Sequence, residues 1–170
     1  MTLATTTTGW TREKAAEVIA EHRNLDGPAL PILHALQETF GHVPDDAVPL
    51  LAEALNLSRA DVHGIISFYH DFRHAPAGRH VVKVCRAEAC QSMGGHALAE
   101  GLLHRLGLQW GGTTGDGQVT IEPVYCLGLC ATAPAALVDG RPVGRLNREK
   151  LDAVVNEVRN DWSHTGRVGA

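Results

Sequence analysis

Cys85-Arg-Ala-Glu-Ala-Cys90 and Cys126-Leu-Gly-Leu-Cys130 together hold all four cysteines of this 170-residue chain. The two close pairs stand on either side of residues 91–125, an interval long enough for a helix. Four thiols in a chain with no others indicate a single site, and thiolates suit zinc or an iron–sulfur cluster. The C-x4-C and C-x3-C spacings differ from the short C-x2-C knuckle common in zinc sites and from the plant-type ferredoxin pattern. Spacing alone therefore supports a zinc site and an iron–sulfur cluster equally. Disulfides or unligated thiols are a third, less favoured possibility.

The composition is that of a soluble globular protein. Hydrophobic residues make up 44% of the chain, the formal net charge is −4 and the pI is about 6.2. These values give no reason to expect a nucleic acid or an anionic membrane as a partner. Residues 1–9 lack the basic and apolar regions of a secretory signal, and no stretch reaches the roughly 20 apolar residues of a membrane span. We therefore predict a cytoplasmic protein without membrane insertion, where reduced thiols favour metal binding over disulfides.

Apolar residues at helical spacing predict a small all-helical domain over residues 11–75, preceded by a disordered lead-in over residues 1–10. Cap and breaker residues separate four helices. Ser58-Arg-Ala-Asp61 resembles a capping box, which predicts the start of the fourth helix. Nothing in this part of the chain demands catalysis. The expected helices cover residues 11–22, 29–40, a stretch that begins at Pro44-Asp45-Asp46, and 60–69.

The periodicity changes after Ala75-Pro76-Ala77-Gly78, and it predicts an α/β domain over residues 79–160 followed by a polar tail over 161–170. The Asp139-Gly140 dipeptide favours a two-residue hairpin turn. We expect both cysteine pairs to lie in loops that follow strands, so that parallel neighbouring strands would bring all four sulfurs together. The predicted β-α-β-β-β-α order comprises strands over 79–84 and 119–124, helices over 94–106 and 148–158, and a hairpin of 135–138 with 141–146.

The residues around the cysteines suit a cluster. Gly128 lies within the second pair, and Gly94-Gly95 follow the first. Small residues let backbone N–H groups approach sulfur, and such hydrogen bonds help to set a cluster's potential. Leu127, Leu129 and Ala131 are expected to form an apolar cover. Arg86 offers a positive charge against the thiolates, and a solvated surface role for it is equally supported.

The segments Val84–Gly95 and Glu122–Val138 resemble the thioredoxin-like [2Fe–2S] ferredoxin family, which includes a component of NADH:quinone oxidoreductase. The family's pattern is C-x4-C-x35-C-x3-C. The resemblance extends over most of the chain, from the helical region that contains Ile65 to the Asp139-Gly140 hairpin, and only the two tails lie outside it. It implies a helical N-terminal region followed by a thioredoxin-like domain. It also implies that one [2Fe–2S] cluster is ligated by Cys85, Cys90, Cys126 and Cys130.

Within this family the sequence looks most like the gamma subunit of soluble NAD-dependent formate dehydrogenases. Tyr125 stands where respiratory-complex members usually have an acidic residue, and Arg86-Ala-Glu-Ala89 replaces their usual Thr and Pro. The resemblance implies a partner diaphorase subunit that binds FMN, NAD and a [4Fe–4S] cluster, and through it a formate-oxidising molybdenum subunit. The chain would hold its cluster beside the FMN as an electron-transfer subunit, with no catalytic residue of its own. Equivalent subunits of NADH:quinone oxidoreductase and NAD-linked hydrogenase are the nearest alternatives.

Two other functions stay open from the residues themselves. A four-cysteine structural zinc module would give a colourless protein whose fold collapses on chelation. A dithiol redox enzyme is disfavoured, because thioredoxin-type chemistry uses C-x-x-C and neither pair has that spacing. The ten histidines are scattered, and His70 and His74 lack a cysteine pair at zinc-finger distance before them.

Overall fold

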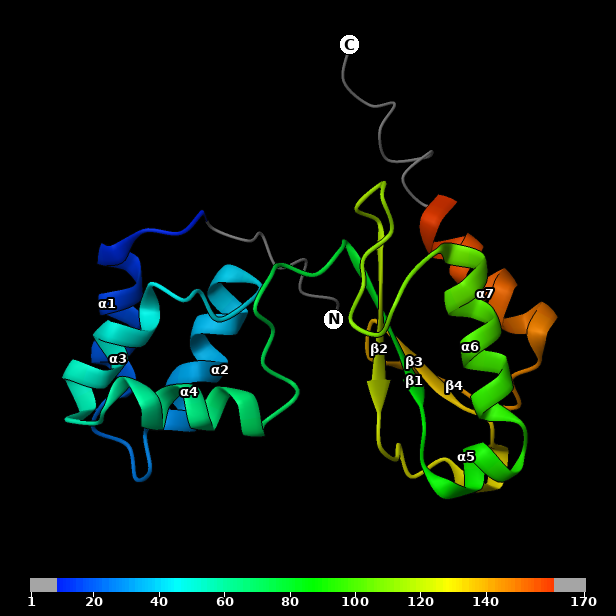
Figure 1. Ribbon diagram of the computed structural model, residues 1–170, viewed down its shortest axis with the longest axis horizontal. Coiled ribbons are helices and arrows are strands. Elements are labelled where there is room, and N and C mark those ends of the chain that lie inside the picture. Colours follow the sequence, from blue (N-terminus) through cyan, green and yellow to red (C-terminus); the bar gives the residue numbers. More distant parts are fainter. Residues whose placement is uncertain (1–8, 161–170) are drawn as a thin grey trace, which may run out of the picture. The chain divides into compact units, whose positions relative to one another are not determined.

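The computed structural model describes residues 9–160, and the chain divides between Pro76 and Ala77 into two compact units. The first unit is built from helices, as the apolar spacing predicts (Figure 1). Its core is a single cluster of buried aliphatic and aromatic side chains, including Leu33, Leu51 and Phe40. The four helices are α1 (Arg12–His22), α2 (Ala29–Phe40), α3 (Ala47–Leu55) and α4 (Arg59–Phe68).

Local signals in the sequence start and stop these helices. The Thr11 side chain accepts a hydrogen bond from the Lys14 N–H and caps α1. Gly41 ends α2 with a left-handed backbone, φ 78°, which glycine adopts without a steric penalty. The predicted capping box at the start of α4 is present, because the side chains of Ser58 and Asp61 each accept a hydrogen bond from the other residue's backbone N–H.

The segment after α4 folds back onto α2 through Gln37. The Gln37 amide donates to the carbonyl of Asp71 at 2.8 Å and accepts from the backbone N–H of Arg73 at 2.7 Å. These bonds hold Phe72 against the helical core, where only 5% of it is exposed. The hydrogen bonds of Gln37 and the buried Phe72 ring therefore fix the segment after α4 against the helical core.

The second unit is an α/β structure built on one four-stranded sheet of order β2-β1-β3-β4. Strands β1 and β2 are parallel neighbours, whereas β3 is antiparallel to both β1 and β4. The predicted α/β class, the βαβ start and the antiparallel hairpin are therefore confirmed. The elements are β1 (His80–Cys85), α5 (Glu88–Ser92), α6 (Gly95–Leu106), β2 (Val119–Val124), the 3₁₀ turn η1 (Cys130–Thr132), β3 (Ala136–Val138), β4 (Arg141–Val143) and α7 (Arg148–Asn160).

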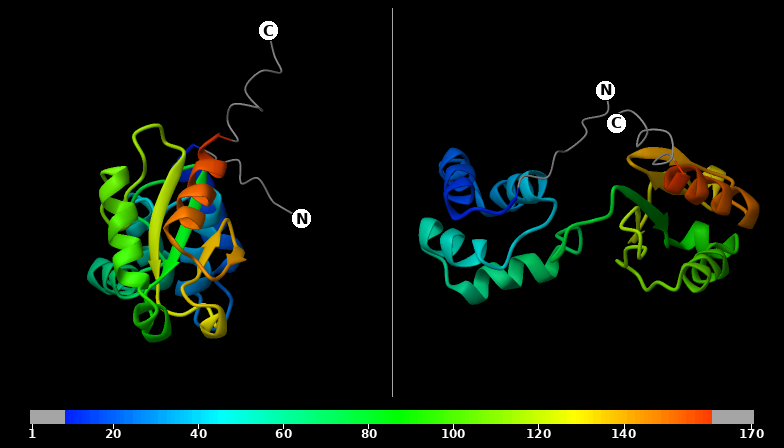
Figure 2. Two further views of the ribbon diagram at one scale, coloured as in Figure 1. Left: turned by 90° about the vertical axis from the view of Figure 1, so that its right-hand side faces the viewer. Right: turned by 90° about the horizontal axis from the view of Figure 1, so that it is seen from above.

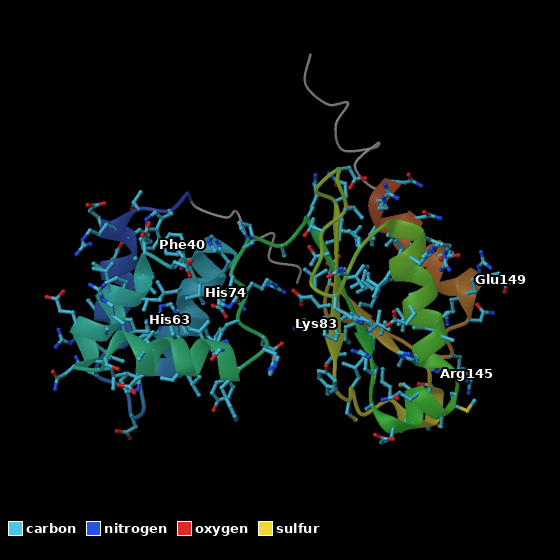
Figure 3. The ribbon with its side chains drawn as sticks, viewed as in Figure 1. Phe40, His63, His74, Lys83, Arg145 and Glu149 are labelled. Atoms are coloured by element: carbon cyan, nitrogen blue, oxygen red, sulfur yellow. The ribbon has the colours of Figure 1, made fainter. Side chains whose placement is uncertain are left out.

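Helices α6 and α7 lie side by side against one face of the sheet (Figures 1 and 2). The strands supply that face with alternate side chains, so Val82 and Val84 of β1 are buried in the core shared with these helices. Lys83 extends from the opposite face (Figure 3), where its ammonium lies 3.7 Å from the carboxylate of Glu122 on β2. The period-2 pattern of β1 thus places Val82 and Val84 on the face that α6 and α7 cover and Lys83 on the other face.

The hairpin between β3 and β4 turns at Asp139-Gly140 with φ values of 49° and 80°, as the dipeptide predicts. The Asp139 carboxylate also accepts hydrogen bonds from the Val81 N–H and the His80 ring, each at 2.8 Å. The turn therefore anchors the beginning of β1.

Ion pairs join α7 to neighbouring elements. Asp152 pairs with Arg105 of α6, and Arg159 pairs with Asp116 in the loop before β2.

Some boundaries differ from the sequence expectation. The short elements α5 and η1 are not predicted, since one turn of helix is too short to show a period. Strand β4 ends at Val143, before the expected residue 146, and α7 extends two residues beyond 158 to Asn160.

Most of the predicted lead-in (residues 1–8) and all of the predicted tail (161–170) lie outside the described residues. Among residues 9–160, no helix has the length and apolar character needed to span a membrane.

Replacing Phe40 by alanine should strongly destabilise the helical unit. Phe40 is 1% exposed, and its ring lies edge-on to that of Trp10 with centroids 5.2 Å apart. Removing a buried aromatic ring leaves a cavity and costs about 3–5 kcal/mol of unfolding free energy. Phe68→Ala is the matched control, because Phe68 is 73% exposed and its loss should change stability by no more than about 0.5 kcal/mol. Urea unfolding of both full-length variants measures the difference, and equal losses would contradict the described packing.

Candidate metal centre

The four cysteines are gathered at one end of the sheet, where the parallel strands β1 and β2 finish. Cys85 is the last residue of β1 and stands in register with Val124, the last residue of β2. Cys90 lies in α5, Cys126 follows β2 closely, and Cys130 begins η1. Figure 1 shows α5 and the segment after β2 together at this end of the sheet.

The placement corrects the expectation that both pairs lie in loops after strands. Only Cys126 sits in such a loop, because Cys85 belongs to a strand, Cys90 to a helix and Cys130 to a 3₁₀ turn. The correction matters physically, since regular backbone hydrogen bonds fix a position more firmly than a loop does.

Three segments meet around Cys85. Its backbone N–H donates to the carbonyl of Ala135 at 3.0 Å, and the next N–H, of Arg86, donates to the carbonyl of Val124 at 2.8 Å. Cys85, Cys90 and Ala135 form a small buried cluster of their own. Ala131, expected to belong to the cover, is exposed instead. The partly buried residues that pack on the cluster are Ala87, Val124, Leu127, Leu129 and Ala133.

The surroundings of the two buried thiols shift their pKa values in opposite directions. Burial by itself raises the pKa of the Cys85 thiol, but hydrogen bonds from the N–H groups of Ala87, Cys126 and Leu127 and from the Cys90 thiol outweigh it, so the pKa is lowered. The pKa of the Cys90 thiol is raised by its burial and by its hydrogen bond with Cys85. The Gly128 N–H lies 3.4 Å from the Cys126 sulfur and donates to it. The backbone of the second pair therefore lies close enough to the first to lower the pKa of the Cys85 thiol.

The site has a buried side and an open side. Cys85 and Cys90 are each 3% exposed, whereas Cys126 and Cys130 are exposed. Two large side chains next to the cysteines in sequence are also open to solvent, because Tyr125 is 67% exposed and Met93 is 63% exposed. Anything held by all four sulfurs would thus be shielded by protein on one side and accessible from the other.

Two backbone features shape the site. A Cβ on Gly95, the first residue of α6, would lie 2.5 Å from the Cys90 carbonyl oxygen, so the helix can approach the cysteine only because this residue is glycine. Cys126 has φ 97°, a left-handed conformation that is rare for a residue with a side chain. Such outliers concentrate at functional sites, where the surrounding structure holds them in place.

Arg86 and the histidines are the other candidate residues near or outside the cysteine site. The Arg86 guanidinium lies over the Trp110 ring, 4.9 Å from its centroid, where a cation–π contact holds it. Its predicted role of offsetting the thiolate charge stays a prediction. Among the described residues, no group of three or more His, Cys, Asp and Glu side chains is close enough to bind one metal ion. In this part of the chain, therefore, neither the scattered histidines nor any three of the four cysteines stand close enough together to hold a single metal ion.

The donor set nevertheless fits an iron–sulfur cluster. All four cysteines are free thiols, and a [2Fe–2S] cluster takes four cysteine ligands shared between two irons. Two facing pairs suit that division better than they suit one tetrahedral zinc ion, which needs four donors around a single point. The Gly128 N–H that donates to the Cys126 sulfur and the apolar residues packed on Cys85 and Cys90 are surroundings that would tune such a cluster.

The sequence of this chain is similar to those of a known family and of several known proteins. The thioredoxin-like [2Fe–2S] ferredoxin family matches residues 15–159 of the chain. An NADH-quinone oxidoreductase subunit from Pseudomonas aeruginosa is 39% identical over 112 residues, covering 65% of this chain and 67% of that protein. The corresponding protein of Mycobacterium bovis, also named as an NADH-quinone oxidoreductase subunit, is 31% identical over 156 residues, covering 92% of this chain and 62% of that protein.

A solved structure shares the architecture. A chain of an NAD⁺-reducing [NiFe]-hydrogenase in the H₂-reduced state is similar with a TM-score of 0.60 and 29% sequence identity. The similarity covers 75% of this chain but only 22% of the hydrogenase chain. This protein thus corresponds to about two thirds of the two curated relatives described above and to a small part of the hydrogenase chain.

Gly95→Ala should destabilise the junction between Cys90 and α6. The added methyl would overlap the Cys90 carbonyl, so α6 must shift, at a cost of about 1–3 kcal/mol in unfolding free energy. Gly101→Ala in the same helix is the control, because its methyl would meet only the flexible Arg105 side chain. Alanine should be neutral there or stabilising by up to about 1 kcal/mol. Urea unfolding of the two variants tests the steric claim, which fails if they are equally stable.

Proposed function

The chain belongs to the thioredoxin-like [2Fe–2S] ferredoxin family, and we propose that it is an electron-transfer subunit of an NAD-linked oxidoreductase complex. In this proposal Cys85, Cys90, Cys126 and Cys130 hold one [2Fe–2S] cluster, which supplies reversible one-electron transfer when bound. The observation that carries the proposal is the placement of both cysteine pairs at the end of the parallel strands, with Cys85 in register with the last residue of β2 and Cys126 two residues beyond it.

The chain's own residues prepare the site for that task. The β1–β2 pairing fixes Cys85, and α5 carries Cys90 in the same buried apolar cluster. These elements keep water from one side of the site, while the exposed Cys126 and Cys130 leave the other side open to a partner. An electron carrier needs such an open side, because its electrons must pass to another protein.

The names of the relatives suggest the kind of partner. One group belongs to NADH-quinone oxidoreductase and the other to an NAD⁺-reducing hydrogenase, so both work in complexes that handle NAD. This sequence offers no nucleotide-binding motif; its loop over residues 111–117 lacks the Gly-Lys-Ser/Thr ending of a P-loop. We infer that NAD and a flavin, FMN, are bound by a partner diaphorase subunit, and that this chain has no active site of its own.

Among such complexes we propose a formate dehydrogenase, in which electrons reach the flavin from a formate-oxidising molybdenum subunit. Tyr125 before the third cysteine and Arg86-Ala-Glu-Ala89 within the first pair favour this branch by resemblance. The NAD-linked hydrogenase is the second candidate, favoured by the structural similarity at a TM-score of 0.60. NADH:quinone oxidoreductase is the third, favoured by the curated relatives.

Anaerobically prepared wild-type protein should contain two irons and two acid-labile sulfides per chain, with a visible absorption that bleaches on reduction by dithionite. Serine at any of the four cysteine positions should remove or strongly deplete the cluster, because a serine hydroxyl is a poorer ligand for the cluster irons than a cysteine thiolate. His96→Ala, six residues from Cys90, is the control and should retain full cluster content. One zinc and no sulfide in the matured wild type would contradict the cluster and favour the structural zinc module.

Affinity purification of the full chain from its native host should recover a flavin-containing subunit and an NAD⁺-reducing activity. We expect formate to reduce NAD⁺ in this preparation, whereas hydrogen and quinone should not act as redox partners. Activity with hydrogen instead of formate would assign the chain to the hydrogenase class, and quinone-linked NADH oxidation would assign it to the respiratory class. Recovery without any flavoprotein would contradict the proposed partner altogether.

A further inference from the structure

We propose that a groove beside α6 is a docking site for the flavin-containing partner subunit, and that it accepts a lysine or arginine side chain of that partner. The inference rests on the proposed function, since it names a surface by which this chain meets its partner. The groove has a volume of about 450 Å³. Its lining residues are Glu100, Leu103, His104, Leu108, Gln109 and Trp110.

Backbone hydrogen bonds fix the walls of the groove. One wall is the C-terminal half of α6, and the other is the segment that follows this helix. The Leu108 N–H donates to the carbonyl of Leu103 at 2.9 Å, and the Gly111 N–H donates to the carbonyl of Ile121 in β2 at 2.8 Å. The second bond ties the segment that carries Trp110 to the sheet. A site that is already ordered loses less conformational entropy when it binds a partner.

The floor of the groove is apolar. Leu103 is 4% exposed and belongs to the core under α6, and Leu108 and Trp110 are partly buried against the same core. The Arg86 guanidinium, 4.9 Å from the centroid of the Trp110 ring, holds that ring in place. Such a floor suits the aliphatic stem of a lysine or arginine, which lies along apolar surface while its charged end stays near water.

Glu100 gives the groove its charge. It is exposed, and it is the only lining residue with a formal charge when histidine is neutral. Among residues 9–160, no basic side chain forms an ion pair with its carboxylate, because Arg105 of the same helix pairs with Asp152 instead. A carboxylate without a cation, next to an apolar floor, is complementary to a side chain with an apolar stem and a positive end.

The groove adjoins the cysteine site but is separate from it. Arg86, whose guanidinium contacts Trp110, directly follows Cys85 in the chain. Neither of the exposed cysteines, Cys126 and Cys130, is among the lining residues. A partner anchored in the groove is therefore held beside the cysteines and leaves the open side of their site free for its flavin.

Glu100→Gln tests the groove, with Glu157→Gln as its matched control. Each variant removes the charge of one exposed helical glutamate of the same unit, and neither glutamate forms an ion pair within the described residues. The probe is the flavin-containing subunit that is purified with the full chain from its native host and then separated from it. We expect Glu100→Gln to raise the dissociation constant of the holoprotein for this subunit roughly fivefold. Glu157→Gln should leave it unchanged.

Charge reversal sharpens the test. Glu100→Lys would face the partner's cation with a like charge, so it should raise the dissociation constant by roughly tenfold or more, whereas Glu157→Lys should not. Added salt should weaken the binding of the wild type more steeply than that of Glu100→Gln. Iron and sulfide content should match the wild type in all these variants, because both glutamates lie outside the cysteine site.

The outcomes separate this inference from the proposed function. An unchanged dissociation constant in both Glu100 variants overturns the groove alone, as does an equal loss in the Glu157 controls. Self-association of the wild type that is lost only in the Glu100 variants, with flavoprotein binding intact, would give the groove to a second copy of this chain and also overturn the inference. A wild type that binds no flavoprotein refutes the proposed partner, and the groove's role falls with it.

Discussion

The parallel pairing of β1 with β2 is the constraint on which the site depends. Its register sets Cys85 opposite Val124, so the chain leaves both strands at the same level and in the same direction. A slip of one residue would send the side chain of Cys85 to the other face of the sheet, because successive strand residues alternate. The same slip would turn Val82 and Val84 out of the core that they share with α6 and α7. The packing of the helices and the alignment of the cysteines are therefore enforced by the same hydrogen bonds.

The site itself joins a rigid half to an accessible half. The rigid half is Cys85 and Cys90, held in a strand and a helix and covered by Ala135. The accessible half is Cys126 and Cys130, held in a turn and a 3₁₀ segment after the exposed Tyr125. The backbone of Cys126 and Leu127 lies near enough to Cys85 to lower the pKa of its thiol, so the two halves adjoin. This division meets the two demands on an electron carrier: a protected redox group and a short route to a partner.

Much of this arrangement is predictable from the sequence. The helices of the first unit follow from apolar spacing and caps such as Ser58, and the hairpin follows from Asp139-Gly140. The grouping of the four cysteines follows from their spacing once strands are placed before each pair. The match of residues 15–159 confirms the family that these segments resemble, whereas the ligand roles and the formate branch stay predictions.

What the sequence does not reveal depends on contacts between distant segments. The hydrogen bond from the Cys85 N–H to the Ala135 carbonyl joins residues some fifty positions apart, so no local pattern signals it. Likewise, the glycine at position 95 looks like an ordinary helix start, and its need for close approach to the Cys90 carbonyl appears only in three dimensions.

The unequal burial of the cysteines also has a consequence for how the holoprotein is assembled in the cell. Incoming iron and sulfide, or a cluster passed on by a donor protein, first meet the solvent-facing thiols of Cys126 and Cys130. Cys85 and Cys90, at 3% exposure, are shielded from such an encounter by the surrounding protein. If the four cysteines hold the cluster as proposed, the exposed pair is the one that a donor reaches first.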